Sequence, residues 1–163
     1  KSISTAIPSA MMVLMLSRDR QYEAKYRQLM ALVEKLGIRD RIISIPPVPH
    51  SELPAYVKAA DCVIVPSLSE GFGYTAAEAA AMGKPIIATD TTSLPEVVSG
   101  KHILVPPRSS REIATAVENA YKDGYHRTKL RKFTIEENVS SYVKVYKEIS
   151  SRAFRHQAIN RRY

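Results

Sequence analysis

Short apolar runs alternate with helical patterns along this chain, and that alternation limits its fold more than any other feature. The apolar runs are Ala10–Leu16, Ile42–Ile45, Cys62–Val65, Pro85–Thr89 and Ile103–Val105. In the segments between them, apolar residues recur every three or four positions, which is typical of helices. Because the runs are apolar on both faces, they predict parallel strands covered by helices on both sides. We therefore expect an α/β fold with a Rossmann-like, doubly wound parallel sheet.

The length and composition fit one domain over residues 1–163. The 163 residues are 45% hydrophobic and 25% charged, as in globular proteins with a buried core. No apolar run approaches the roughly 20 residues that span a bilayer. The chain begins with Lys1 rather than methionine, so we expect a piece of a longer protein, truncated at its N-terminal edge. Residues 151–163 form a basic tail.

The net charge of +8 fits a nucleic acid, an anionic membrane, a phosphorylated ligand or simply a well-solvated surface. Basic and aromatic residues do not interleave as they do in nucleic-acid-binding proteins, so we predict no nucleic-acid partner. The histidines, at positions 50, 102, 126 and 156, lack metal-ligand spacing, so we predict no metal site and no cofactor. The single cysteine, Cys62, lies in an apolar run and indicates a reducing compartment such as the cytoplasm.

The loop after the third predicted strand has the composition of a ligand site. In a doubly wound sheet, ligands bind outside the carboxyl ends of the strands. Here Glu70 precedes the turn Gly71-Phe72-Gly73, which leads into a predicted helix. Glycine lets the backbone approach a ligand closely, and a helix N-terminus favours a phosphate group. Glu78 follows within the helix, and two carboxylates suit the hydroxyls of a sugar and a ribose. The loop therefore predicts a nucleotide-sugar site.

Each of these residues also has a purely structural interpretation. Thr75 to Glu78 fits a capping box, in which the Glu78 side chain would bond the Thr75 backbone. Glu70 fits a solvated loop acid, and Phe72 fits a packing residue. Glycines occur in any tight turn into a helix. The residues alone leave these alternatives open.

Further capping boxes mark two helices near the end of the chain. Ser109 to Glu112 and Thr134 to Glu137 both have the pattern that opens a helix. In the last helix we expect one apolar face to point inward, with the following members: Val139, Tyr142, Val143, Tyr146 and Ile149.

The segment from Glu70 to Glu78 resembles a two-glutamate motif, with seven residues between the acids. That motif belongs to the retaining glycosyltransferases of the group 1, family 4 type, which include sucrose- and glycogen-type synthases. Segments in the same order before and behind it also resemble that family: Gly37–Ile42, Leu53–Ser67, Glu78–Thr89, Leu94–Val98 and Ile103–Pro107. The resemblance covers about residues 10–150. It implies that this chain is the C-terminal, donor-binding half of a GT-B fold.

The resemblance also implies roles for individual residues. Glu70 would be the catalytic-site residue that holds hydroxyls of the donor sugar and places its anomeric carbon. The backbone from Gly71 to Thr75, including Phe72, Gly73 and Tyr74, would contact the sugar and diphosphate. Glu78 would hold the nucleotide ribose, and Pro46–Val48 would lie beside the base. The family is typically metal-independent, and its mechanism is described as front-face with retained configuration.

Three departures from the family pattern limit what can be carried over. The arginine and lysine that bind the donor phosphates have no counterpart in this chain. Thr92 and Ser93 stand where the family often has two glycines, which puts donor contacts there in question. The N-terminal acceptor-binding domain is absent, so we expect the isolated chain to be nearly inactive. The basic tail would pack on that missing partner or contact an anionic membrane at its inner face.

Two other functions remain as alternatives. A sugar epimerase or phosphorylase of the same two-domain architecture would change the chemistry, but the two-glutamate spacing argues against it. A non-enzymatic Rossmann-like module that binds nucleotides or nucleic acid would fit the charge, but no sequence motif supports it.

Overall fold

The computed structural model describes residues 2–17 and 19–160, with side chains described up to residue 151. The chain divides into two compact units, Lys1–Leu130 (unit 1) and Arg131–Tyr163 (unit 2). Unit 1 contains all the strands that the structure describes, and unit 2 contains one long helix, α7 (Ile135–Asn160). The candidate site residues of the sequence therefore all lie in unit 1.

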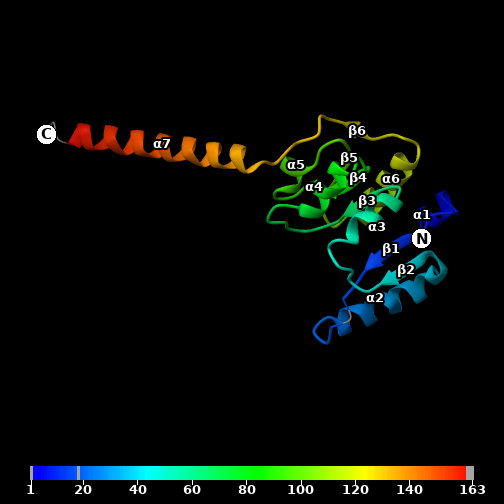
Figure 1. Ribbon diagram of the computed structural model, residues 1–163. Helices are drawn as coiled ribbons and strands as arrows, with labels where there is room; N and C mark the ends of the chain where they lie inside the picture. The colour runs from blue at the N-terminus through cyan, green and yellow to red at the C-terminus, as the bar shows by residue number, and fades with distance from the viewer. Residues whose placement is uncertain (1, 18, 161–163) are drawn as a thin grey trace. The chain divides into compact units, whose positions relative to one another are not determined.

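The elements of unit 1 follow the predicted alternation of strands and helices (Figure 1). In chain order they are α1 (Ser2–Ala6), β1 (Met12–Met15), α2 (Glu23–Leu36), the 3-10 turn η1 (Arg39–Arg41), β2 (Ile42–Ile45), α3 (Leu53–Ala59), β3 (Val63–Val65), α4 (Tyr74–Ala81), β4 (Ile86–Thr89), α5 (Leu94–Val97), β5 (Lys101–Val105), α6 (Ser110–Tyr121) and β6 (His126–Arg127). The five predicted strands all form. Two elements were not predicted. The sequence of α1 has no clear helical period, and the sequence of β6 has no apolar run.

The strands of unit 1 form two sheets rather than one. β1 and β2 pair in parallel from Met12–Ile42 to Met15–Ile45. The second sheet has the order β3-β4-β5-β6, in which the first three strands are parallel and β6 is antiparallel to β5. Figure 1 shows β1 and β2 apart from the four-stranded sheet. The predicted α/β class with a Rossmann-like parallel arrangement is confirmed, although no described strand joins β1 to β3.

Helices cover both faces of the four-stranded sheet. On one face, Val65, Ile86 and Ala88 pack against the small side chains of α4 and against Leu94 of α5. On the other face, Ile87 and Val105 pack against α6, through Ala116 and its neighbours. Successive residues of β4 thus enter opposite cores, which is why the run Ile86–Thr89 is buried throughout. This doubly covered sheet is a rigid support for the loops at its carboxyl edge.

The two-residue strand β6 is fixed by a cluster of polar and aromatic side chains. The Asp123 carboxylate accepts hydrogen bonds from the Tyr125 hydroxyl and from Arg127 Nη2, the latter at 2.6 Å. The Arg127 guanidinium and the Lys101 ammonium lie over the Tyr125 ring. The Tyr125 hydrogen bond, with the neighbouring Arg127 and Lys101 charges, lowers the pKa of Asp123. The antiparallel end of the sheet is therefore held by side chains rather than by a long ladder.

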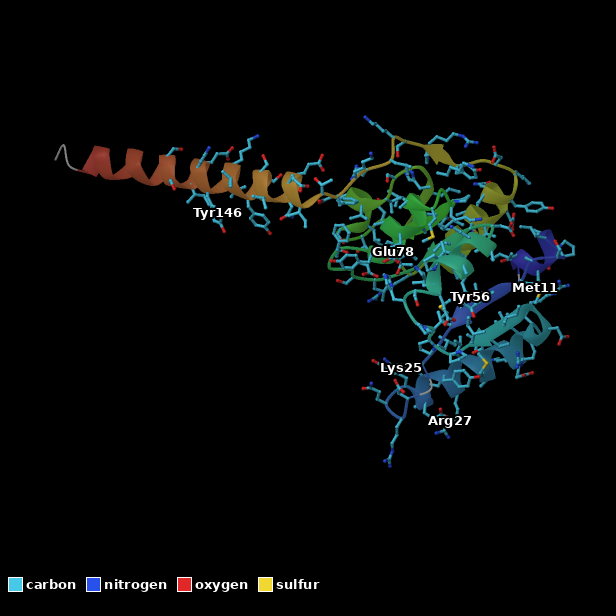
Figure 2. All side chains as sticks on the ribbon, in the orientation of Figure 1. Met11, Lys25, Arg27, Tyr56, Glu78 and Tyr146 are labelled. Carbon is cyan, nitrogen blue, oxygen red and sulfur yellow. The ribbon has the colours of Figure 1, made fainter. Side chains whose placement is uncertain are left out.

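Helix α7 is described here within unit 2 alone. The N-terminal cap is confirmed, because the Glu137 amide donates to Thr134 Oγ1 at 3.2 Å. Within unit 2 itself nothing covers the face predicted to point inward, and its side chains are exposed there: Val139, Tyr142, Val143, Tyr146 and Ile149. Burial of this face against another part of the protein stays a prediction. Figure 2 shows Tyr146 as one of these side chains. An amphipathic period alone therefore did not establish burial for this helix.

The predicted basic tail, residues 151–163, begins inside α7, and residues 161–163 lie outside the described part of the chain. Its contact with a membrane surface stays a prediction. Among the described helices, none combines the length and apolar character of a membrane-spanning segment.

Candidate functional site

Two loops at one edge of the four-stranded sheet build the candidate site. β3 ends at Val65 and β4 ends at Thr89, and the two strands are hydrogen-bonded neighbours in parallel register. Their carboxyl ends therefore meet at the same edge. The loop that follows β3, residues 66–72, contains Glu70, and the loop that follows β4 is residues 90–93. The side chains at this edge determine how the first loop is held.

Threonine hydroxyls join the two loops. The buried Thr89 hydroxyl donates to the Ser67 carbonyl, and the Thr91 hydroxyl donates to the Leu68 carbonyl at 3.3 Å. These bonds continue the pairing of β3 and β4 beyond the last ladder residue, with side chains replacing backbone groups. The loop after β3 is therefore anchored along its length and not only at its ends.

Glu70 is held at three of its atoms. Its backbone amide donates to Thr92 Oγ1 at 3.0 Å, and its carbonyl accepts from Ser93 Oγ at 3.1 Å. Its carboxylate Oε1 accepts from Ser67 Oγ at 2.7 Å. The second carboxylate oxygen has no hydrogen-bond partner among the described residues, and Glu70 forms no salt bridge with them. The half-buried Glu70 side chain thus offers one oriented, unused acceptor.

Gly73 directs the chain from this loop into α4. It is the N-cap residue of α4, with φ 100° and ψ 47°. A Cβ at this position would lie 2.9 Å from Leu94 Cδ2, so both the backbone angle and the packing require glycine. Gly71 is different, because a Cβ there would meet no heavy atom within 4 Å. The small size of Gly71 leaves open space beside the backbone.

The start of α4 has free backbone donors. Gly73 has no side chain that could cap the helix, and its carbonyl accepts from the amides of Ala76 and Ala77. Within the described residues, the amides of Tyr74 and Thr75 make no hydrogen bond. These two N–H groups, together with the helix dipole, form a site that suits an anion.

Glu78 does not act in a capping box. α4 begins at Tyr74, so Thr75 lies inside the helix and is not the capping residue. Glu78 instead lines a hollow of about 120 Å³ with four residues from α3, the loop before it and the C-cap of α4: His50, Leu53, Pro54 and Met82. Figure 2 labels Glu78 on the ribbon. The structure therefore brings Glu78 close to the segment that follows β2, which contains the Pro46–Val48 loop that the family resemblance predicts beside the nucleotide base.

The aromatic residues of the motif lie beside each other. The ring centroids of Phe72 and Tyr74 are 4.9 Å apart, with a tilt of 48° between the planes. Tyr74 is 73% exposed, whereas Phe72 is half-buried. Tyr74 is therefore a surface side chain at the helix N-terminus, and Phe72 packs against it.

Other parts of unit 1 add little to this site. A larger hollow, of about 300 Å³, lies at the carboxyl end of β1 and is lined by Met15, Leu16, Ser17, Tyr22, Lys25, Tyr26 and Leu29. Burial, with a smaller effect of Asp61, raises the pKa of the Cys62 thiol, so the thiol is a poor nucleophile. Among the residues whose side chains the structure describes, no group of three or more potential metal ligands is placed to hold an ion.

Sequence reasoning missed the residues that hold Glu70. Ser67 was not singled out, and Thr92 and Ser93 were noted only as departures from glycine. One signal was present: Thr89, Thr91, Thr92 and Ser93 concentrate hydroxyl groups directly after a buried strand. Their partners could not be inferred, because they lie more than twenty positions away in the chain.

Comparison with known proteins gives a consistent result. The family model for glycosyl transferases group 1 matches residues 22–137, which is more than half of the chain. The D-inositol 3-phosphate glycosyltransferase of Paenarthrobacter aurescens (strain TC1) is 37% identical over 102 residues, covering 61% of this chain and 25% of that protein. The chain thus spans about a quarter of the length of that relative.

Solved structures resemble the fold. Sucrose-phosphate synthase from Thermosynechococcus elongatus matches with a TM-score of 0.67 and 31% identity, covering 76% of this chain and 33% of that one. The Anabaena protein HepE, solved with UDP-glucose, matches with a TM-score of 0.68 and 22% identity, covering 75% of this chain and 34% of that one. The identity with HepE is low, so that similarity shows the fold alone.

Proposed function

Because the chain belongs to the glycosyl transferases group 1 family, we propose that it is the donor-binding part of a retaining glycosyltransferase. The enzyme would transfer a hexosyl group from a nucleoside-diphosphate sugar to a glycan or lipid acceptor. The observation that carries this proposal is the placement of Glu70 and Glu78 on either side of the uncapped N-terminus of α4. Along the chain, that arrangement offers the Glu70 carboxylate, then the free amides at the start of α4, and then the Glu78 carboxylate.

The three parts of a nucleotide sugar fit these three groups. The diphosphate would accept hydrogen bonds from the amides of Tyr74 and Thr75, which have no other partner among the described residues. Glu78 would accept from the two hydroxyls of the ribose, and the base would lie toward His50 in the adjoining hollow. The open space beside Gly71 would let the donor approach the backbone. HepE, a structure of similar fold, was solved with UDP-glucose, which supports a nucleotide sugar as the class of donor.

Glu70 would hold the sugar. Its unpaired carboxylate oxygen would accept hydrogen bonds from hydroxyls of the hexose and so fix the anomeric carbon. In the transfer, the bond from the anomeric carbon to the diphosphate oxygen breaks, and its electron pair leaves with the diphosphate. The acceptor oxygen bonds to the anomeric carbon from the same face, and its proton passes to the departing phosphate oxygen. The α4 amides would stabilise the charge that develops on that oxygen.

Catalysis would require more than this chain. We propose that no metal takes part and that the acceptor is bound by a part of the protein outside residues 1–163. The chain spans about a quarter of the Paenarthrobacter relative, which leaves room for that part. The isolated chain would then bind donor nucleotides without transferring the sugar.

Titration calorimetry of the 163-residue chain with UDP, GDP and a short DNA duplex tests the proposal. We expect one nucleotide to bind and the duplex not to bind. Glu78→Ala removes a charged acceptor for the ribose, so nucleotide affinity should fall about tenfold or more. Glu118→Ala is the matched control, since Glu118 is also a half-buried glutamate within a helix but lies in α6.

The control variant should bind the nucleotide as the parent chain does. If Glu78→Ala lowers the melting temperature but leaves nucleotide affinity unchanged, Glu78 has a structural role only. Tight binding of the duplex, with no nucleotide binding, would instead favour the nucleic-acid alternative.

A further inference from the structure

The loop after β4 contains an unusual backbone conformation beside Glu70. Thr92 has φ 45°, in the left-handed region that side chains branched at Cβ rarely adopt. Such a conformation is strained and persists only when its surroundings hold it. Thr92 is exposed, so side-chain packing does not explain it. Among the described residues, the one hydrogen bond of its side chain is that which Oγ1 accepts from the Glu70 amide.

The next residue completes the contact. Ser93 Oγ donates to the Glu70 carbonyl at 3.1 Å, so two adjacent hydroxyls bind both backbone polar groups of one residue. Glycines at positions 92 and 93 could adopt the same backbone but would supply neither hydroxyl. A glycine would adopt this backbone conformation without strain, whereas the threonine adopts it with strain and places a hydroxyl against Glu70.

We propose that Thr92 and Ser93 are positioning residues that clamp the Glu70 backbone and so fix where its free carboxylate oxygen meets the donor sugar. This inference rests on the proposed function of Glu70. The clamp fixes the peptide groups on both sides of the Glu70 Cα, and Ser67 fixes Oε1. The remaining oxygen then has one orientation, which lowers the entropy lost when it binds a hydroxyl.

The clamp should affect the sugar and not the nucleotide. Glu70 is separated from Glu78 by the start of α4, and none of the residues that line the Glu78 hollow bonds to Thr92 or Ser93. Loosening Glu70 should therefore weaken binding of a sugar nucleotide relative to the matching free nucleotide. A role in folding alone would lower both affinities or neither.

Three substitutions at position 92 separate the hydroxyl from the strain. Thr92→Val keeps the branched shape but lacks the hydroxyl, Thr92→Gly lacks both, and Thr92→Ser keeps the hydroxyl. Affinities of the 163-residue chain would be measured for UDP-glucose, UDP-N-acetylglucosamine and GDP-mannose, each against UDP or GDP. The loss of affinity in Glu70→Ala measures how much the Glu70 carboxylate contributes to binding of the sugar. Thr128→Val is the matched control, because it makes the same change at a distant exposed threonine.

For the sugar nucleotide that binds, Thr92→Val and Thr92→Gly should reduce the affinity ratio of sugar nucleotide to nucleotide about three- to tenfold. Thr92→Ser and Thr128→Val should keep the ratio. Thr92→Gly should also melt at the same or a higher temperature than the parent, because glycine removes the strain. Loss of sugar-dependent binding in a more stable protein cannot come from unfolding.

Hydrogen exchange at the Glu70 amide tests the clamp without any ligand. Thr92→Val should speed this exchange, because the amide loses its acceptor, and Thr92→Ser should not. Unchanged exchange in Thr92→Val overturns the clamp itself. Faster exchange with an unchanged affinity ratio, where Glu70→Ala does lower that ratio, overturns its role in positioning. If neither the parent chain nor Glu70→Ala discriminates sugar nucleotides from nucleotides, the proposed function of Glu70 fails, and the role of the clamp fails with it.

Discussion

At the scale of single residues, Gly71 and Gly73 look equivalent in the sequence, but the structure requires glycine at these two positions to different degrees. Gly73 adopts φ 100° and lies where a Cβ would approach Leu94 within 2.9 Å. Gly71 has neither constraint within the described structure. Packing and backbone angle therefore account for the first glycine, whereas only ligand access would account for the second.

This difference predicts unequal losses of stability for two alanine substitutions. Gly73→Ala should lower the free energy of unfolding by about 2–4 kcal/mol, from backbone strain and from overpacking against Leu94. Gly71→Ala should change it by less than about 0.5 kcal/mol, as expected for an open surface position. Urea denaturation followed by circular dichroism measures both, and equal midpoints for the two variants would contradict this reading of the turn.

At the scale of elements, helix α6 supports the sheet face opposite to the candidate site. Ala114 and Ala116 are buried, and Ala116 packs against Ile87 and Val105. The helix begins at a capping residue, since Ser109 Oγ accepts from the Glu112 amide at 3.3 Å. The capping box predicted from the sequence is thus confirmed for this bond.

Removing that cap should destabilise unit 1. We expect Ser109→Ala to lower the free energy of unfolding by about 1 kcal/mol, because the Glu112 amide loses its partner. Ser110→Ala is the matched control, since Ser110 is the first helical residue and its hydroxyl has no hydrogen bond within the described part of the chain. Thermal unfolding of both variants would decide the matter; a loss of the same size in Ser110→Ala would contradict the assigned role of Ser109.

At the scale of the whole molecule, the core belongs to unit 1. Every buried hydrophobic residue of the described structure lies between Ile7 and Ala116, whereas the described side chains of α7 are exposed. A chain that ends at Leu130 contains this whole core and should therefore keep its sheet, with a cooperative transition in urea. A chain that ends at Lys122 also loses β6 and Leu130, whose side chain lies close to Gly100, and should unfold earlier. Similar midpoints for the two truncated chains would show that β6 contributes nothing.

The sequence predicted those parts of the structure that depend on local pattern. The runs around β3, β4 and β5 are apolar because helices cover both sheet faces, and Gly37 and Gly83 end helices with positive φ, as expected. The sequence could not predict β6, because His126 and Arg127 form no apolar run. Their strand partners, His102 and Lys101, are distant in the chain. Nor could it predict the conformation of Thr92, since a threonine disfavours positive φ unless a distant partner such as the Glu70 amide holds it.

The two edge strands of the four-stranded sheet, β3 and β6, are unlike, so the two edges differ in how readily another strand can pair with them. At one end, β6 is two residues long, and the charged and aromatic cluster of Asp123, Tyr125 and Arg127 lies at its start. So short and polar an edge is a poor template for backbone pairing with another strand. At the other end, β3 consists of Val63, Ile64 and Val65 and pairs, among the described strands, only with β4. Strand-by-strand growth of this sheet, whether into a larger native sheet or into an aggregate, can therefore proceed from β3 and is blocked at β6.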